Sequence, residues 1–198
     1  MKKNTKDAVL LKALPDVPFD GWTDDLLDAA CRKARVTAAQ KQKLFPDGVV
    51  DLVCHFSTWA TEEMRQKMKK MPLQKMRTHE RVTAGVRARL DVLAPHKEAG
   101  RQAFSFLMKP TQGARLPKLI WHAADVIWDM AGDTSTDYNR YTKRLLLSGV
   151  LSSTTLYWFN DDSAGNTKTW DFLDRRIQNV LKAGKLIGQL KSIKEKYA

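Results

Sequence analysis

The chain has 198 residues, of which 43% are hydrophobic and 28% charged; this is the composition of one globular domain and excludes a disordered chain. No apolar run approaches the roughly 20 residues that a membrane-spanning helix needs. The formal net charge of +12 predicts an anionic partner, such as nucleic acid, an anionic membrane surface or an acidic protein.

Helical spacing of apolar residues covers nearly the whole chain, and no segment has the sustained alternation of a strand. The expected boundaries come from helix-breaking prolines, from Gly132 and from the capping residues Thr23, Thr37 with Gln40, and Thr167. In chain order, the predicted helices are Lys6–Leu14, Thr23–Ala34, Ala38–Leu44, Asp47–Lys70, Leu73–Leu93, Lys97–Met108, Pro117–Ala131, Asp137–Asn160 and Thr167–Lys191. The predicted fold class is therefore all-α.

The N-terminal third has the order of a helix-turn-helix unit, with turns at Phe19–Trp22 and Val36–Thr37. This order resembles the opening of TetR-type regulators, in which the third helix enters the DNA major groove and the later helices form a ligand-binding, dimerising body. Here the third helix offers four polar side chains: Gln40, Lys41, Gln42 and Lys43. These can contact phosphates or base edges, but a short exposed helix in any basic protein would look the same.

The positive charge is concentrated between residues 65 and 89, where nine basic side chains stand against the single acid Glu80. They are Arg65, Lys67, Lys69, Lys70, Lys75, Arg77, Arg81, Arg87 and Arg89. Charge alone does not distinguish DNA from lipid head groups, and a solvated helix face would also account for the pattern.

No catalytic or metal-binding motif stands out. The best candidate is His122 with Asp125 and Asp129, which share one face of a predicted helix. No second helix supplies the carboxylates and histidine of a di-metal centre, so we interpret this face as the polar edge of an amphipathic helix. The sequence thus predicts no enzyme, no cofactor and no metal.

The helix expected at 137–160 is charged only in its first turns and is then apolar on nearly every face. Such a helix is expected to be buried on several sides, against the core, a cavity and a second subunit. Small residues near its middle would allow another helix to approach closely. With the last helix, it is predicted to form an isologous homodimer interface. The expected interface residues are Leu145, Ser148, Gly149, Ser152, Leu156, Trp170, Leu173 and Ile177.

Several long segments together resemble the coenzyme Q biosynthesis accessory proteins of the Coq-nine family, which have a TetR-like fold. The signature is GDTSTDYNRYTKR at Gly132–Arg144, followed by LYWFNDDS at Leu156–Ser163 and TWDFLDRRIQNV at Thr169–Val180. Upstream, LFPDG at Leu44–Gly48 and VRARLDVLAP at Val86–Pro95 also fit. The resemblance covers most of the chain, from about Trp22 to Lys182.

The resemblance implies a non-enzymatic lipid-binding protein of ubiquinone biosynthesis. Such a protein would hold an isoprenoid intermediate and present it to the demethoxyubiquinone hydroxylase. The alternative function is a TetR-type transcriptional regulator with an apolar effector pocket. Under the lipid-binding hypothesis no sequence-specific DNA binding is expected. The expected division is a helix-turn-helix-like unit at 1–46, a lipid-binding and dimerisation body at 47–191 and a polar tail at 192–198.

Two sets of residues follow from these expectations. Eight apolar side chains are expected to line the lipid cavity: Met64, Leu90, Phe104, Leu107, Ile120, Trp121, Ile127 and Leu147. The charged start of the apolar helix is expected to dock the hydroxylase through Tyr138, Arg140, Tyr141, Lys143 and Arg144. The structural alternative is that Thr136 and Asp137 only cap this helix and that Tyr141 is core.

The expected location is the cytoplasm, in part peripheral at the inner face of the membrane. The sequence shows no signal peptide, and Cys31 and Cys54 suit a reducing compartment as small core residues. Mitochondrial members of the family carry an extra C-terminal amphipathic helix, which the polar end KSIKEKYA does not supply. Members often have an aromatic residue where Arg140 stands. With no such C-terminal helix expected, membrane contact would rest on basic side chains attracted to anionic lipid and on rearranged helices of the body.

Overall fold

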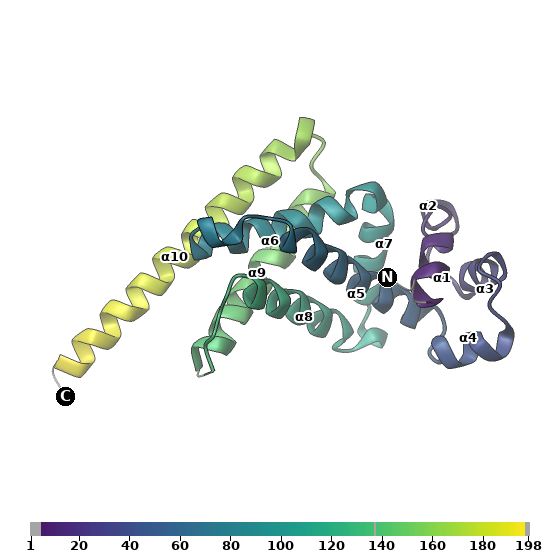
Figure 1. Ribbon diagram of the computed structural model, residues 1–198, viewed down its shortest axis with the longest axis horizontal. Helices are drawn as coiled ribbons and strands as arrows, with labels where there is room; N and C mark the ends of the chain where they lie inside the picture. The colour runs from purple at the N-terminus through teal and green to yellow at the C-terminus, as the bar shows by residue number, and fades with distance from the viewer. Residues whose placement is uncertain (1–4, 137, 197–198) are drawn as a thin grey trace.

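The computed structural model describes residues 5–136 and 138–196, with side chains up to Lys182. Among these residues all regular structure is helical, as the sequence predicts (Figure 1). The α-helices are α1 (Thr5–Ala13), α2 (Val17–Asp20), α3 (Asp24–Lys33), α4 (Ala38–Leu44), α5 (Val49–Lys69), α6 (Thr78–Leu93), α7 (Lys97–Leu107), α8 (Arg115–Met130), α9 (Tyr138–Phe159) and α10 (Thr167–Lys196). Short 3₁₀ turns lie at Leu73–Lys75, Ala94–His96, Pro110–Gln112 and Ala164–Asn166.

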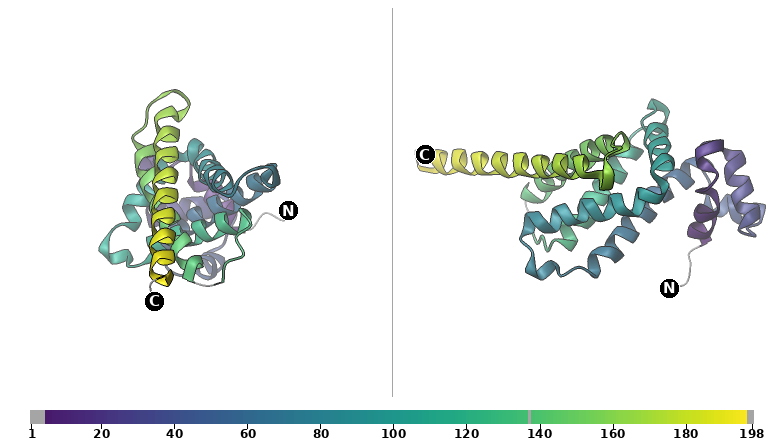
Figure 2. Two further views of the ribbon diagram at one scale, coloured as in Figure 1. Left: turned by 90° about the vertical axis from the view of Figure 1, so that its left-hand side faces the viewer. Right: turned by 90° about the horizontal axis from the view of Figure 1, so that it is seen from above.

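The N-terminal unit, α1 to α4, lies at one end of the molecule, and α10 runs past the body at the other end (Figures 1 and 2). Two predicted caps begin its helices. The Thr23 hydroxyl accepts a hydrogen bond from the backbone N–H of Leu26 at the start of α3. Thr37 and Gln40 form the expected capping box at the start of α4. Local capping chemistry therefore sets the starts of both α3 and α4.

Two apolar clusters hold the molecule together, and α5 contributes to both. The first joins the N-terminal unit to the near half of α5 through side chains such as Leu27, Leu52 and Phe56. The second lies between the far half of α5, α6, α8, α9 and α10. Gly85 allows α6 to pass close to α8, because a Cβ there would lie 2.8 Å from a methyl carbon of Ile127.

Two expected helix starts and one expected cap need correction. The helix expected from Leu73 begins at Thr78, because Met76 and Arg77 are extended and the Glu80 carboxylate accepts the Arg77 N–H at 2.6 Å. α8 begins at Arg115, which leaves Pro117 inside the first turn. Thr167 does not cap α10; Ser163 and Asp161 accept its first backbone N–H groups instead.

Helix α9 is buried on three sides and open on the fourth. It packs against α8, α10 and α7. Its fourth side is the α9 outer face, formed by Tyr138, Tyr141, Leu145, Gly149 and Leu156, all of which are exposed in the single chain. The helix therefore leaves apolar side chains uncovered where a surface helix would be polar. No helix among the described residues has the length and apolar character needed to cross a bilayer.

Candidate functional site

An apolar cleft opens between five helices of the body. Its empty space is about 620 Å³ including the solvent at its mouth, of which about 70 Å³ is wide enough to hold water. Helices α5 to α9 each contribute to the walls, with Val53, Phe56, Ser57, Arg89, Leu93, Gly100, Ala103, Phe104, Leu107, Leu116, Ile120, Ala123, Leu151, Ser152, Thr155 and Phe159. The cleft is thus narrow and mostly apolar, which is the usual character of a small-molecule site.

Two aromatic rings face each other within this wall. The Phe104 ring on α7 meets the Phe159 ring at the end of α9 edge to face, with 6.0 Å between their centroids. Gly100 lies beside Phe159, where a Cβ would come within 3.4 Å of the ring. The two rings together therefore form part of the apolar wall of the cleft.

The structure divides the eight residues expected around the cavity. Phe104, Leu107 and Ile120 line the cleft. The other five do not. Met64, Leu90 and Ile127 are fully buried in the packed core, Leu147 lines a separate crevice against α10, and Trp121 lies beside Tyr141. Helical periodicity marks the buried face of each helix but does not separate packed core from cleft wall.

Arg89 lines the cleft, whereas the sequence analysis named it only among the nine basic side chains of residues 65–89. Its Nη1 donates to the Thr61 hydroxyl at 2.6 Å, and its Nη2 donates to the Ser57 hydroxyl at 3.0 Å. Burial lowers the pKa of the Arg89 guanidinium to about 10. The signal in the sequence was a basic residue within the apolar stripe of α6, between Val86 and Leu93.

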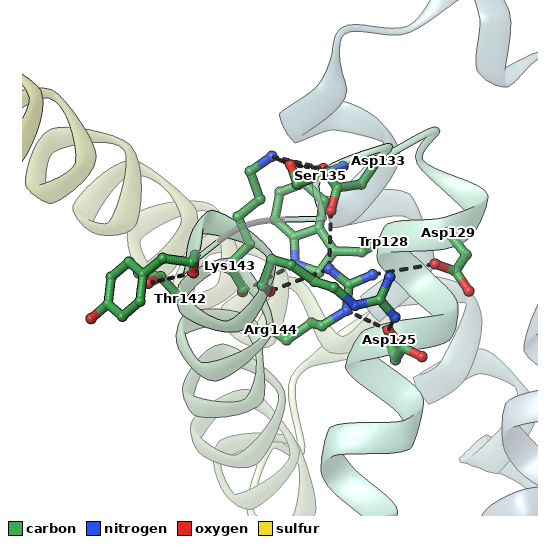
Figure 3. A network of polar contacts seen from close by, with 10 residues as sticks. Asp125, Trp128, Asp129, Asp133, Ser135, Thr142, Lys143 and Arg144 are labelled. Carbon is green, nitrogen blue, oxygen red and sulfur yellow. Dashed lines mark hydrogen bonds and ion pairs between the residues drawn. The ribbon is translucent and has the colours of Figure 1, made fainter.

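A buried ionic cluster fixes the start of α9, where the docking surface was expected (Figure 3). The Arg144 side chain is 1% exposed and reaches three carboxylates. Its Nη1 lies 3.0 Å from Asp133, its Nη2 lies 3.3 Å from Asp129, and its Nε donates to Asp125. Arg144 is therefore unavailable to a partner, which corrects its expected role in docking.

Lys143 completes this cluster from the outside. Its ammonium lies 2.7 Å from both Asp133 and the Ser135 hydroxyl, and 5.5 Å from the centre of the Trp128 ring. Burial raises the pKa of Asp133, but hydrogen bonds from Lys143, Ser135 and Arg144 outweigh it and hold this pKa well below its ordinary value. Asp133 is thus ionised and anchors the turn between α8 and α9.

Of the three residues weighed as a metal site and interpreted as a polar helix edge, Asp125 and Asp129 belong to this cluster. Asp125 and Asp129 face Arg144, and Asp125 also binds Arg140 at 3.0 Å. Within the described part of the chain, no three His, Cys, Asp or Glu side chains converge in a way that would hold a metal ion.

The aromatic residues of the expected docking surface are accessible. Tyr138 is 81% and Tyr141 61% exposed, so Tyr141 is not core. Leu145 follows on the same face at 66% exposure. Asp137, the expected cap, lies outside the described residues.

The residues expected at a dimer interface fall into two groups. Leu145, Gly149 and Leu156 lie on the α9 outer face. Beyond its chain neighbours and the adjoining backbone of α9, no atom of the described residues lies within 4 Å of a Cβ built on Gly149. The side chains of the other five are wholly or partly buried in the single chain. Leu173 and Ile177 are buried in the core of the single chain, Ser152 lines the cleft, and Ser148 and Trp170 are half-buried. Leu173 and Ile177 are consequently inaccessible to a second copy.

The helix-turn-helix unit offers fewer free polar groups than its sequence suggests. The Gln40 side chain accepts the Thr37 N–H at 2.9 Å, and Lys41 forms an ion pair with Asp28. Gln42 and Lys43 remain exposed. The basic segment around the turn from α5 to α6 lies at the end of the body away from this unit (Figures 1 and 2).

Fold and cleft together define the class: an all-α protein of TetR-like architecture, with an apolar cleft in its helical body. A TetR transcriptional regulator from Nitrosomonas europaea ATCC 19718 has the same fold, with a TM-score of 0.69, 15% sequence identity and coverage of 87% of this chain and 95% of its own.

Sequence comparison identifies the family. The COQ9 family model matches residues 114–184. COQ9-B of Xenopus laevis, a mitochondrial ubiquinone biosynthesis protein, is 32% identical over 201 residues, which cover 98% of this chain and 68% of that protein. The COQ9 proteins of Bos taurus and Homo sapiens, also mitochondrial, are 31% and 30% identical over 94% of this chain. This chain belongs to the COQ9 family and spans 60% of the length of the bovine relative.

Proposed function

We propose that this protein is a non-enzymatic lipid-binding protein of ubiquinone biosynthesis. It holds an isoprenoid intermediate in the cleft between α5 and α9 and presents it to the demethoxyubiquinone hydroxylase. The observation that carries the proposal is the cleft itself, because all five helices contribute apolar side chains to its walls. The relatives are named as ubiquinone biosynthesis proteins, which supplies the pathway.

The free energy available from such a cleft is substantial. Sheltering a methylene group from water is worth about 0.8 kcal/mol, so one five-carbon isoprene unit is worth about 4 kcal/mol when fully buried. Part of that free energy is needed to separate the Phe104 and Phe159 rings, because the space now present is narrow. We therefore expect the lipid to enter by opening the wall between α7 and α9.

Docking of the hydroxylase is assigned to the N-terminal end of the α9 outer face. Exposed aromatic side chains are frequent anchors of protein interfaces, and Tyr138 and Tyr141 project from this turn. The Arg144 cluster beneath them holds the turn rigid, which lowers the entropy cost of binding. Arg144 thus supports the docking surface without touching the partner.

We assign a homodimer interface to the rest of the α9 outer face. Leu145 and Leu156 are exposed apolar side chains, and Gly149 between them permits close approach of a second helix. An isologous contact would place the two copies of α9 against each other. The aromatic turn at Tyr138 would then stay free at the edge of the dimer.

Contact with an anionic membrane is assigned to the basic segment at the turn from α5 to α6. Lys67, Lys69 and Lys70 are exposed there. Each basic side chain near an anionic surface contributes about 1 kcal/mol, and salt weakens this attraction. We accordingly propose a cytoplasmic protein that associates peripherally with the inner face of the membrane.

A TetR-type transcriptional regulator is the second candidate, favoured by the fold alone. The polar side chains of α4 argue against it, because the Gln40 side chain is used in capping and Lys41 is paired with Asp28. We expect DNA binding to be weak and independent of sequence, since phosphate contacts carry no sequence information. Nanomolar affinity for one operator at physiological salt, abolished by changing Lys43, would favour the regulator.

The proposed function is tested by organic extraction of the purified protein, followed by mass spectrometry of the extract. Wild type should release an apolar lipid in stoichiometric amount. Thr155→Phe, which places a ring in the cleft, should release much less. Thr83→Phe makes the same change in the outer groove between α6 and α10 and should retain the lipid. Equal lipid content in the two variants would contradict binding in the cleft.

A further inference from the structure

Arg89 is the only charged side chain among the described residues that line the cleft. Among the described residues that line it, the other fifteen are apolar, or carry hydroxyl groups, as in Ser57, Ser152 and Thr155. The Arg89 guanidinium donates to neutral oxygens alone: the hydroxyls of Ser57 and Thr61 and the backbone carbonyl of Ser57 at 3.3 Å. No carboxylate in the described part of the chain forms an ion pair with it.

Its neighbour on the same helix shows the contrast. Arg87 lies two residues earlier, forms an ion pair with Asp174 at 3.7 Å and stacks over the Trp170 ring. Arg144 likewise has three carboxylates around it. A cation held away from water is costly unless it is paired with an anion. Arg144 is buried and paired, and Arg87 is 42% exposed and paired, whereas the half-buried Arg89 has no carboxylate partner within the described residues.

A structural role does not by itself account for a charge at this position. The hydrogen bonds from Arg89 join α6 to α5, but Ser57 and Thr61 are neutral and would accept equally well from an uncharged amide. An arginine here leaves one uncompensated positive charge facing an apolar cleft. Charge-assisted hydrogen bonds are about twice as strong as neutral ones, so an anionic oxygen is the ligand group that gains most from this position.

We propose that Arg89 makes the cleft selective for amphiphiles with one apolar chain and one singly charged oxygen group, a carboxylate or a phenolate. The chain lies against Phe104, Ile120 and Phe159, and the charged oxygen binds the guanidinium at the α5–α6 wall. One cation matches one negative charge, and the described lining offers no second cation for a phosphate or diphosphate. This inference rests on the proposed lipid function and specifies the class of ligand.

The test compares three ligands with the same chain: oleate, methyl oleate and oleyl alcohol. Each is titrated at pH 7.5 against delipidated protein, and binding is followed by displacement of the neutral fluorophore N-phenyl-1-naphthylamine. Wild type should bind oleate about tenfold or more tightly than the ester and the alcohol. Arg89→Gln should lose this preference while binding the alcohol as before. Arg89→Lys, which keeps the charge, should retain most of it.

Arg87→Gln is the matched control, because it removes the same charge from the same helix outside the cleft. It should keep the wild-type preference for oleate. Equal binding of the three ligands to wild type, or an unchanged preference in Arg89→Gln, would overturn the inference. The comparison of oleate with methyl oleate uses wild type alone. It therefore tests the inference even if Arg89→Gln proves unstable. Failure of all three ligands to bind would overturn the proposed function together with this inference, whereas equal binding overturns this inference alone.

Discussion

Replacing Arg144 by methionine should destabilise the fold strongly. Removing one partner of a buried ionic cluster typically costs 3–5 kcal/mol, because the remaining charge is left without compensation. Here Asp133 is only 4% exposed and loses its Arg144 contact, but it keeps Lys143; Asp129 is 56% exposed and can be hydrated. We therefore expect the lower end, about 3 kcal/mol, which for a domain of this size lowers the melting temperature by about 6–12 °C.

Arg140→Met is the matched control, because Arg140 binds Asp125 from a position that is 40% exposed. Such surface pairs contribute at most about 1 kcal/mol, so its melting temperature should fall by no more than about 4 °C. Urea unfolding should rank the two variants in the same order. A melting temperature for Arg144→Met that equals that of Arg140→Met would refute the assignment of Arg144 to a buried structural cluster.

Three further results are expected. The free energy of unfolding should fall as pH drops below about 4, because the pKa of Asp133 is lower in the folded chain and protonation therefore favours the unfolded chain. In urea titrations, the free energy of unfolding of Asp133→Asn should fall less steeply with pH than that of wild type. An identical fall in the two proteins would contradict this. Tyr138→Ala with Tyr141→Ala should weaken capture of the hydroxylase about tenfold or more without changing the melting temperature. Phe19→Ala removes an equally exposed ring in the N-terminal unit and should capture normally, whereas wild-type capture by the tyrosine variant would place docking elsewhere. Gly149→Trp should shift sedimentation toward monomer, and a wild type that is monomeric at micromolar concentration would remove the proposed dimer.

Local rules predicted most of the helices correctly, because caps and periodicity act over three or four residues. The capping box of Thr37 with Gln40 is an example. The start of α6 was not predicted, because Arg77 is not one of the usual N-cap residues. Its backbone N–H instead donates to the Glu80 carboxylate, and nothing in the helical spacing indicated that this contact begins the helix.

The role of Arg144 could not be read from its own neighbourhood. Its three carboxylate partners lie 11 to 19 residues away, and its position in a charged turn is typical of a solvated surface. A signal was nonetheless present, since Asp125, Asp129 and Asp133 repeat every four residues and face one side of α8 and its end. The polar face of α8, which we interpreted as the edge of an amphipathic helix and weighed as a metal site, is the acidic side of the Arg144 cluster.

The cleft was predicted only in part for a related reason. Apolar residues facing inward are needed equally by a packed core and by a cavity wall, so Ile127 and Ile120 look alike in sequence. Their difference depends on how helices from distant parts of the chain are spaced. Only the tertiary arrangement shows that Ile120 borders empty space and that Ile127 packs against Gly85.

Photocrosslinking tests the central claim, lipid binding in the cleft, most directly. The delipidated protein is incubated with an isoprenoid chain that carries a diazirine, irradiated, digested and mapped by mass spectrometry. Labels are expected on the cleft walls, near Phe104, Ile120 and Phe159, and they should be lost in Thr155→Phe but not in Thr83→Phe. Labels confined to the outer groove between α6 and α10, or unaffected by Thr155→Phe, would contradict it.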